Sequence, residues 1–314
     1  MKVLIADKFP DNHIQTLKDN GIEVVYEAKA GENDIPNLVK DAEFIVVRST
    51  NVNAAAINAG ANLKIVIRAG SGYNNIDVKA ATEKGISVSN TPGKNSIAVA
   101  ELAMGLLVSL DRKIPDNVKD FTAGVWNKAK YSKAEGLFGK TLGIIGVGNI
   151  GREIAKRAQA FGMKVIGYDV VKSEGIGIEY IEDLEKLISM SDAITLHVPA
   201  NPQTKGMFND KLFGLMKKGA MLINTSRADV IDEDALIKAV KEKGIIAAVD
   251  VFKGEPEGKD GAVISKLQNV DGIYVTHHIG ASTEQAQDAV AEETIKIILE
   301  YKKSGQILHC VNKK

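Results

Sequence analysis

The sequence has few of the residues and segments that mark whole classes of protein. Its single cysteine, Cys310, excludes a disulfide within the chain and fits a reducing compartment. The 40 basic and 40 acidic side chains give a formal net charge of zero, which argues against broad electrostatic binding of nucleic acid or an anionic membrane. No apolar run approaches the ~18 residues of a membrane helix, and residues 3–6 are too short for a signal-peptide core. We therefore expect a cytoplasmic protein without nucleic-acid or membrane partners and without a metal site.

The chain does have an ordinary globular composition and a regular alternation of elements. Of its 314 residues, 45% are hydrophobic and 25% charged, which excludes disorder and collagen-like repeats. At ~150 residues per domain, the length predicts two domains. Short apolar runs alternate with amphipathic stretches, which is typical of βαβ units and predicts an α/β fold with parallel sheets. The predicted strands are 3–6, 23–26, 44–47, 64–67 and 86–89, then 141–145, 164–168, 193–197, 220–224, 245–249 and 273–276.

Three segments separate or follow these two series. Residues 96–110 are apolar nearly all round, which predicts a buried helix that helps to form a homodimer. A polar segment, 111–139, contains the only tryptophan, Trp126, and the last predicted helix spans 283–303. The second α/β series therefore begins at the buried helix.

A glycine-rich turn follows the predicted strand 141–145. Gly146 would allow a tight turn, Gly148 would let a pyrophosphate approach the backbone, and Gly151 would let strand and helix pack closely. The helix that follows offers its N-terminal amides and positive dipole end to the phosphates. The next predicted strand ends at Asp169, whose carboxylate can accept both ribose hydroxyls and would repel a 2′-phosphate. This pattern favours NAD over NADP; the alternative is a glycine-rich turn followed by a surface acid.

From Gly146 onward the ordered motifs resemble those of the D-isomer-specific 2-hydroxyacid dehydrogenases, and the resemblance covers nearly the whole chain. The motifs are Gly146-x-Gly148-x-x-Gly151, Asp169, His197-Val198-Pro199 with Pro202 and Thr204, Asn224-Thr225-Ser226-Arg227, Asp250-Val251-Phe252 with Glu255-Pro256, and His278-Ile279-Gly280. Within the family, segments 45–49 and 68–72 are most similar to the phosphoglycerate dehydrogenases. The resemblance implies two Rossmann-like or flavodoxin-like domains with a cleft between them.

Three residues have the chemistry that oxidation of a 2-hydroxy acid requires. His278 has the intrinsic pKa range of a base for the hydroxyl proton, and Glu255 would orient the imidazole and favour its protonated form. Arg227 would offer a rigid two-pronged donor to the substrate carboxylate or carbonyl oxygen. Taken singly, each has a structural alternative: a surface arginine, a buried histidine and a loop acid. Their order along the chain favours the catalytic interpretation.

One position departs from the family pattern. The family usually has a proline just before the catalytic histidine, where this chain has His277. Two adjacent histidines therefore compete for the catalytic position. The Ile279-Gly280-Ala281-Ser282 sequence that follows sets the alignment and selects His278.

The resemblance also implies a set of cofactor contacts. The amides of Asn149 and Ile150 would meet the phosphates, and Asp169 the adenosine ribose. The remaining contacts implied are Val198 at the adenosine half, Thr225 and Ser226 at the nicotinamide, Asp250 at the carboxamide, Gly280 and Ala281 beside the catalytic histidine, and Ser71 at the nicotinamide ribose or its phosphate.

A second group of residues is predicted to hold the acid. The glycines of Arg68-Ala69-Gly70-Ser71-Gly72 can expose consecutive amides as an anion nest, and the family uses this loop for the substrate. Arg48 follows a predicted strand and is the candidate for a phosphate at the far end of the substrate, its alternative being a solvated arginine. Lys128, Lys130 and Lys133 are interpreted as a solvated face, with a role at a neighbouring subunit's substrate as the alternative.

These expectations combine into one hypothesis. Residues 1–95 with 283–314 form the substrate-binding domain, and 96–282 form the NAD-binding domain. The reaction implied is oxidation of 3-phosphoglycerate by NAD to 3-phosphohydroxypyruvate, the first step of serine synthesis. The alternatives are a hydroxypyruvate, glyoxylate or D-lactate reductase and, more distantly, an NAD-sensing binding protein. Because the chain stops soon after the last predicted helix, we expect no serine-binding regulatory domain.

Overall fold

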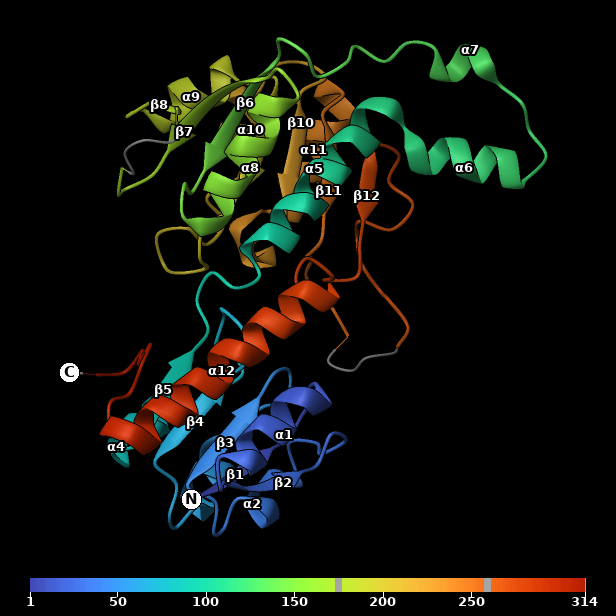
Figure 1. Cartoon of the computed structure of the whole chain (residues 1–314). Coiled ribbons are helices and arrows are strands. Elements are labelled where there is room, and N and C mark those ends of the chain that lie inside the picture. The colour runs from blue at the N-terminus through green and yellow to red at the C-terminus, as the bar shows by residue number, and fades with distance from the viewer. Residues whose placement is uncertain (173–176, 257–260, 314) are drawn as a thin grey trace. The chain divides into compact units, whose positions relative to one another are not determined.

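The chain forms two compact units in the computed structural model, which describes residues 1–172, 177–256 and 261–313 (Figure 1). Unit 1 combines Met1–Asn95 with Ser282–Lys314, so it is built from both ends of the chain. Unit 2 is the continuous segment Ser96–Ala281.

Unit 1 is built on a five-stranded parallel sheet. The strand order, β2-β1-β3-β4-β5, is that of flavodoxin-like sheets. The strands are β1 (Lys2–Ile5), β2 (Glu23–Tyr26), β3 (Phe44–Val47), β4 (Ile65–Arg68) and β5 (Ser87–Asn90). Burial on both faces explains why the central strands are apolar without interruption.

Helices cover both faces of this sheet. Successive residues of a strand point to opposite faces, so Ile5 packs among the residues of one helical layer and Leu4 among those of the other. The first layer is α1 (Asp11–Asp19) with α12 (Glu284–Ser304); the second is α2 (Ile35–Leu38), α3 (Ala54–Ala59) and α4 (Val78–Glu83). The C-terminal segment then runs antiparallel to β5, with a bridge between Ser89 and Cys310.

Unit 2 is built on a seven-stranded parallel sheet of order β12-β11-β10-β9-β6-β7-β8. The strands are β6 (Thr141–Ile145), β7 (Lys164–Tyr168), β8 (Glu179–Tyr180), β9 (Ala193–Leu196), β10 (Met221–Asn224), β11 (Ile246–Val249) and β12 (Ile273–Val275). The chain order reverses between β6 and β9, which is the switch point where ligands bind in doubly wound sheets.

Two helical layers also enclose this sheet. One layer is α5 (Ser96–Arg112) with α8 (Asn149–Ala160); the other is α9 (Leu184–Met190), α10 (Asp210–Leu215) and α11 (Glu233–Lys243). Most of the apolar side chains of α5 are buried within unit 2, against α8 and the sheet. The predicted helix at 96–110 is therefore present and mostly covered by its own unit.

The segment after α5 differs from the rest of unit 2. Helices α6 (Ile114–Thr122) and α7 (Lys128–Tyr131) bury none of their residues and project away from the sheet (Figure 1). Phe121 is 71% exposed and Trp126 is 81% exposed, and Val118 on the same face of α6 is exposed as well. This arm thus carries an apolar surface that unit 2 leaves uncovered.

The predicted fold class is confirmed, because both units are α/β with entirely parallel sheets. Four strands, β2, β3, β6 and β7, have the predicted bounds; β9, β10, β11 and β12 are one residue shorter than predicted, and β1, β4 and β5 are shifted by one residue. The two-residue strand β8 and the helices α6 and α7 were not predicted. Within the described residues, no helix is at once long enough and apolar enough to span a membrane.

Candidate active site

The glycine-rich turn connects β6 to α8 at the switch point of the sheet. Gly146 has φ +93°, and a Cβ there would lie 2.5 Å from the His197 carbonyl oxygen after β9. A Cβ at Gly151 would lie 2.3 Å from the Gly146 carbonyl oxygen. By contrast, no heavy atom lies within 4 Å of a Cβ built at Gly148. Gly146 and Gly151 are thus required by close backbone approach, whereas Gly148 keeps the space above the turn open.

Asp169 lies directly beyond the end of β7 and contacts the glycine-rich turn. Its Oδ2 accepts a hydrogen bond from the Val147 amide at 2.6 Å, and its Oδ1 accepts one from Val171 at 3.1 Å. The carboxylate is therefore fixed beside the first turn residues, where the ribose of a bound dinucleotide lies in this fold.

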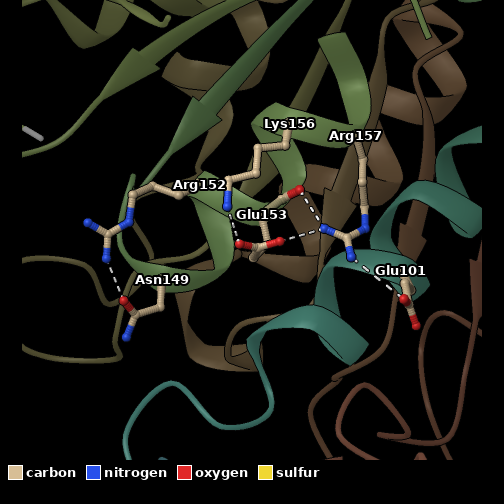
Figure 2. A network of polar contacts seen from close by, with 6 residues as sticks. All are labelled: Glu101, Asn149, Arg152, Glu153, Lys156 and Arg157. Atoms are coloured by element: carbon tan, nitrogen blue, oxygen red, sulfur yellow. Dashed lines mark hydrogen bonds and ion pairs between the residues drawn. The ribbon is translucent and has the colours of Figure 1, made fainter. Parts of the chain in front are cut away.

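The first turn of α8 keeps its amides free of side-chain caps. Gly148 is the N-cap and supplies no side-chain acceptor, so the orphan amides of Asn149 and Ile150 remain for an anion. Figure 2 shows that the polar side chains of this helix pair elsewhere: Arg152 bonds to the Asn149 side chain, and further along the helix Arg157 pairs with Glu153 and Glu101. Of these contacts, the Arg157–Glu101 ion pair links α8 to α5.

The ends of β9 and β10 supply the next residues of this edge. His197 is partly buried, and its Nε2 lies 2.6 Å from the Thr195 hydroxyl. Burial lowers the pKa of His197 to about 3, so this ring is neutral at physiological pH. After β10, Ser226 donates both its amide and its hydroxyl to the Asn224 side chain. The buried Thr225 hydroxyl has no hydrogen-bond partner among the described residues.

His278 and Glu255 form a pair after the last two strands. His278 Nδ1 lies 2.7 Å from Glu255 Oε2, and Glu255 Oε1 accepts the Phe252 amide at 3.0 Å. The carboxylate therefore holds the proton on Nδ1 and leaves Nε2 for the proton that moves in a reaction. The imidazole is about half exposed, so a small molecule can reach it.

The electrostatics of the pair favour the ionised form of both groups. The hydrogen bond with Glu255 raises the pKa of His278, and the charges of Glu255 and Asp250 act in the same direction, against burial and Arg227. Burial would raise the pKa of Glu255, but the hydrogen bond and charge of His278 outweigh it and lower that pKa, with smaller contributions from the Phe252 amide and Arg227. A histidine held in this way is suited to exchange a proton near neutral pH.

Arg227 follows β10 on the same edge. Its backbone carbonyl accepts a hydrogen bond from the Asn224 side chain at 2.9 Å, and its Nη1 donates to the Ser226 carbonyl at 2.7 Å. Burial lowers the pKa of Arg227, and the charge of Glu255 opposes this. The side chain is thus partly desolvated, which strengthens any contact it makes with a carboxylate or a carbonyl oxygen.

Asp250 holds the loop that carries His278. Its side chain is buried, with the residue only 1% exposed, and both oxygens are engaged. Oδ1 accepts from the Thr276 hydroxyl and the Ile279 amide, Oδ2 accepts from the Gly280 amide, and the backbone carbonyl accepts from the His278 amide. These bonds also explain how His278 is held at φ +51°, an uncommon value for a side-chain-bearing residue. Asp250 therefore positions the histidine, a role that the sequence analysis did not assign to it.

The adjacent histidine, His277, is placed differently. It is exposed, and its ring makes no hydrogen bond or ion pair with any residue that the structure describes. Only His278 is brought to Glu255.

In unit 1, the loop after β4 has the features of an anion nest. Gly70 has φ +150°, and a Cβ there would lie 1.3 Å from Nη1 of Arg68, whose guanidinium lies against the loop. The Gly70 amide donates to the Arg68 carbonyl at 2.8 Å and is not available. The amides of Ser71 and Gly72 have no backbone acceptor within the described residues. These two N–H groups are therefore the part of the predicted nest that is available to an anion.

Arg48 lies at the end of β3, on the neighbouring strand of this sheet. Its guanidinium makes no hydrogen bond or ion pair with a described residue. The loop that carries it is held by Asp7, which is 6% exposed: Oδ2 accepts the amides of Arg48, Ser49 and Thr50 at 2.7–3.0 Å. The role of Asp7 was not predicted from the sequence, although an acid directly after the predicted strand 3–6 was a visible signal.

The three lysines near Trp126 are all exposed. Lys130 pairs with Asp120 at 2.8 Å, and neither Lys128 nor Lys133 makes an ion pair with a described residue. Within unit 2, none of them lies among the residues at the glycine-rich edge described above.

Comparison with known proteins gives this geometry its context. Residues 104–280 match the model of "D-isomer specific 2-hydroxyacid dehydrogenase, NAD binding domain". The chain belongs to this family. It is 42% identical over 308 residues to a D-3-phosphoglycerate dehydrogenase of Methanocaldococcus jannaschii, and the matched stretch covers 95% of this chain and 57% of that protein. It is 45% identical over 270 residues to a hydroxypyruvate reductase of Thermotoga maritima, with 85% and 87% of the two chains covered.

A solved structure supports the same assignment. The NAD-bound 3-phosphoglycerate dehydrogenase of Entamoeba histolytica has a TM-score of 0.83 and 31% identity, with 100% of this chain and 99% of that chain covered. The chain thus matches this dehydrogenase along its full length, whereas it spans just over half the length of the curated phosphoglycerate dehydrogenases it matches, 57% and 58% for the first two.

The residues of this dehydrogenase-family chain fit NAD, the cofactor of the family domain. The open space above Gly148 and the uncapped amides of α8 suit a pyrophosphate, and Asp169 lies where it can accept ribose hydroxyls. The orphaned Thr225 hydroxyl needs a partner that the described residues do not supply, and a bound nicotinamide would be one. No arginine follows Asp169 to hold a 2′-phosphate.

Proposed function

We propose that the chain is an NAD-dependent dehydrogenase that oxidises D-3-phosphoglycerate to 3-phosphohydroxypyruvate, as in the first step of serine synthesis, in the cytoplasm. Unit 2 would bind NAD, and unit 1 would bind the acid. The observation that carries this proposal is the His278–Glu255 pair at 2.7 Å, on the same sheet edge as the glycine-rich turn and Arg227. A proton-transfer pair, a cation and a nucleotide turn are the parts that hydride exchange with a 2-hydroxy acid requires.

NAD, when bound, supplies the hydride acceptor for the carbon that carries the hydroxyl. In the oxidation, His278 Nε2 takes the proton of that hydroxyl while Glu255 holds the imidazole at Nδ1 and stabilises the imidazolium that forms. Arg227 binds the oxygen that becomes the carbonyl or the neighbouring carboxylate. Asp250 keeps His278 in place through the Ile279 and Gly280 amides.

Unit 1 would bind the two charged ends of the substrate. The amides of Ser71 and Gly72 would donate hydrogen bonds to the carboxylate, and the Arg48 guanidinium, which has no partner among the described residues, would bind the phosphate. An unpaired arginine beside the acid-binding loop favours a substrate with a second anionic group. The similarity to a hydroxypyruvate reductase makes reduction of hydroxypyruvate or glyoxylate the alternative within the same chemistry.

The test is NADH oxidation with 3-phosphohydroxypyruvate, hydroxypyruvate, glyoxylate and pyruvate. We expect kcat/KM to favour the phosphorylated acid by about 100-fold, which corresponds to about 2.7 kcal/mol. Arg48→Ala should remove most of this preference, while Arg112→Ala, at an exposed arginine of α5, should leave it unchanged. A preference for hydroxypyruvate would overturn the phosphate assignment, and no turnover with any of the acids would overturn the dehydrogenase activity.

We also propose that the protein is a homodimer that covers the arm formed by α6 and α7. This arm buries none of its own residues, while Val118, Phe121 and Trp126 are exposed, so its apolar surface requires a partner surface. A second copy is the partner that is always present. Sedimentation at twice the chain mass of 33.7 kDa is expected, and a monomer at micromolar concentration would contradict the proposal.

A further inference from the structure

Residues 90–95 enclose the acid-binding loop of unit 1 with direct hydrogen bonds. The Asn90 side-chain Nδ2 donates to the Ser71 carbonyl at 2.6 Å, and the Thr91 amide donates to the Gly70 carbonyl at 3.0 Å. The Ser71 hydroxyl in turn donates to Asn95 Oδ1 at 2.8 Å. Asn90 and Thr91 are buried, so these bonds are shielded from water.

These bonds set the direction of the two amides available to an anion. A peptide group is planar and trans, so its N–H points opposite to its C=O. The Gly70 carbonyl shares a peptide with the Ser71 amide, and the Ser71 carbonyl shares one with the Gly72 amide. By fixing both carbonyls on one side, Thr91 and Asn90 direct the Ser71 and Gly72 N–H groups to the opposite side.

The enclosing segment is itself anchored by the C-terminal part of the chain. The Asn90 amide donates to the His309 carbonyl at 3.4 Å, as part of the antiparallel contact along β5. At the other end of the segment, Lys94 pairs with Glu293 of α12 at 2.8 Å. His309 Nε2 bonds to the other oxygen of the same carboxylate, also at 2.8 Å.

Glu293 is thus the common anchor of both ends of the segment. It is only 4% exposed, although it is a charged residue, and a second lysine, Lys296, lies 3.6 Å away. A buried carboxylate with three basic neighbours has a single well-defined position, because any other would leave charges unpaired.

We propose that Asn90 is a positioning residue for the substrate acid, which aims the Ser71 and Gly72 amides, and that Glu293 sets the place of Asn90 through Lys94 and His309. This inference rests on the proposed function, because it assumes that the acid binds at these amides. It assigns to α12 and the C-terminal segment a role in the affinity for the acid.

The first test compares the steady-state kinetics of Asn90→Asp and Asn90→Ala with those of the unchanged enzyme. Asn90→Asp keeps the shape but replaces the donor with an acceptor facing the Ser71 carbonyl, so KM for the acid should rise about tenfold or more, with KM for NADH and kcat within about threefold. Asn90→Ala removes the bond without adding repulsion and should give a smaller rise. Asn37→Ala, at an exposed asparagine of unit 1, is the control and should change neither constant.

The kinetic pattern separates positioning from a purely structural role. If Asn90 only stabilised the fold, its variants would lower the fraction of active enzyme, and kcat per total protein would fall with KM unchanged. That result, or wild-type constants in Asn90→Asp, would overturn the inference. Calorimetric titration of folded Asn90→Ala with the acid measures Kd directly, and the inference expects Kd to rise as KM does. The test therefore does not depend on the kinetics of one variant.

Glu293→Gln tests the anchor. It keeps the size of the side chain but removes the charge that holds Lys94 and His309, so we expect KM for the acid to rise about three- to tenfold. Glu292→Gln, at an exposed neighbour on the same helix, is the matched control and should be unchanged. An effect on KM for NADH instead of KM for the acid would overturn the inference. Absence of turnover in the unchanged enzyme would instead overturn the proposed function, so the two failures are distinguishable.

Discussion

Asp7 in unit 1 and Asp250 in unit 2 play the same structural role in two different sheets: each fixes the position of a loop. Each lies just beyond the end of a parallel strand, β1 for Asp7 and β11 for Asp250, and holds the loop that follows the neighbouring strand, β3 for Asp7 and β12 for Asp250. Each is buried and accepts backbone amides and one hydroxyl of that loop: three amides and the Ser49 hydroxyl for Asp7, and two amides and the Thr276 hydroxyl for Asp250.

The two loops differ in what they present. The loop held by Asp250 carries His278, whose imidazole has a partner, Glu255, and a raised pKa. The loop held by Asp7 carries Arg48, whose guanidinium makes no bond to a described residue of its unit. In the proposed function, the same anchoring arrangement would therefore serve proton transfer in one unit and charge recognition in the other. The chemistry lies in the residue that is held, and the anchor determines how accurately it is placed.

The strongest test of this division is the loss of the histidine. His278→Asn should lower kcat by about 10²- to 10⁴-fold, because general acid–base catalysis contributes that much. KM for the acid should change little, since His278 is not among the residues proposed to bind the charged groups of the acid. The matched control is His277→Asn, which alters the exposed neighbour and should stay within about threefold of the unchanged enzyme. A comparable loss in both variants would contradict the assignment of His278.

The anchors themselves give the second test, in which the same substitution is made in both sheets. Asp250→Asn should lower kcat about tenfold or more with KM for the acid nearly unchanged, because the amide NH₂ would face donors and His278 would lose its position. Asp7→Asn should raise KM for the phosphorylated acid about tenfold and change kcat little. Steady-state kinetics on folded protein, checked by thermal melting, separates the two patterns. If both variants changed the same constant, the comparison between the two anchors would be wrong.

The smallest effect expected is a change of pH dependence. Glu255→Gln removes the main cause of the raised pKa of His278, so that pKa should fall toward its ordinary value. Reduction requires the protonated imidazole and is lost as pH rises through this pKa, so its alkaline limb should move to lower pH. Oxidation requires the neutral imidazole, so it should extend to lower pH. pH profiles of kcat/KM in both directions, with Glu135→Gln as an exposed control, measure the shift. Unchanged profiles would show that Glu255 does not act on His278.

Much of the fold could be predicted because burial dominates the strands. Central strands such as β3 and β6 are covered on both faces, so their apolar runs begin and end where the strands do. Strand β8 has only two residues and gives no such signal. Helix α6 was not predicted, although Pro115 in its first turn is a typical start signal. Its apolar residues Ile114, Val118 and Phe121 share one face, but the polar residues between them hid this pattern.

Some residues of the candidate site could likewise be predicted from the sequence, and others could not. Gly146, Gly151 and the His278–Glu255 pair follow from motifs that are local in sequence or fixed by strand order. Asn90 and Glu293 could not be predicted, because their roles depend on a segment more than 200 residues away, as the contact between Ser89 and Leu308 with a separation of 219 residues illustrates. No periodicity or short motif carries information over that distance.

Because unit 1 is built from both ends of the chain, it cannot be completed until the last residues have been translated. Unit 2 is continuous, so it can fold as soon as residue 281 has left the ribosome, whereas one face of the unit 1 sheet is covered only by α1 until α12 is made. Until then, Phe44, Ile65 and Ile67 lack the Ile295 and Ile298 side chains that bury them. The nascent protein therefore carries a partly exposed apolar sheet face until α12 has been translated.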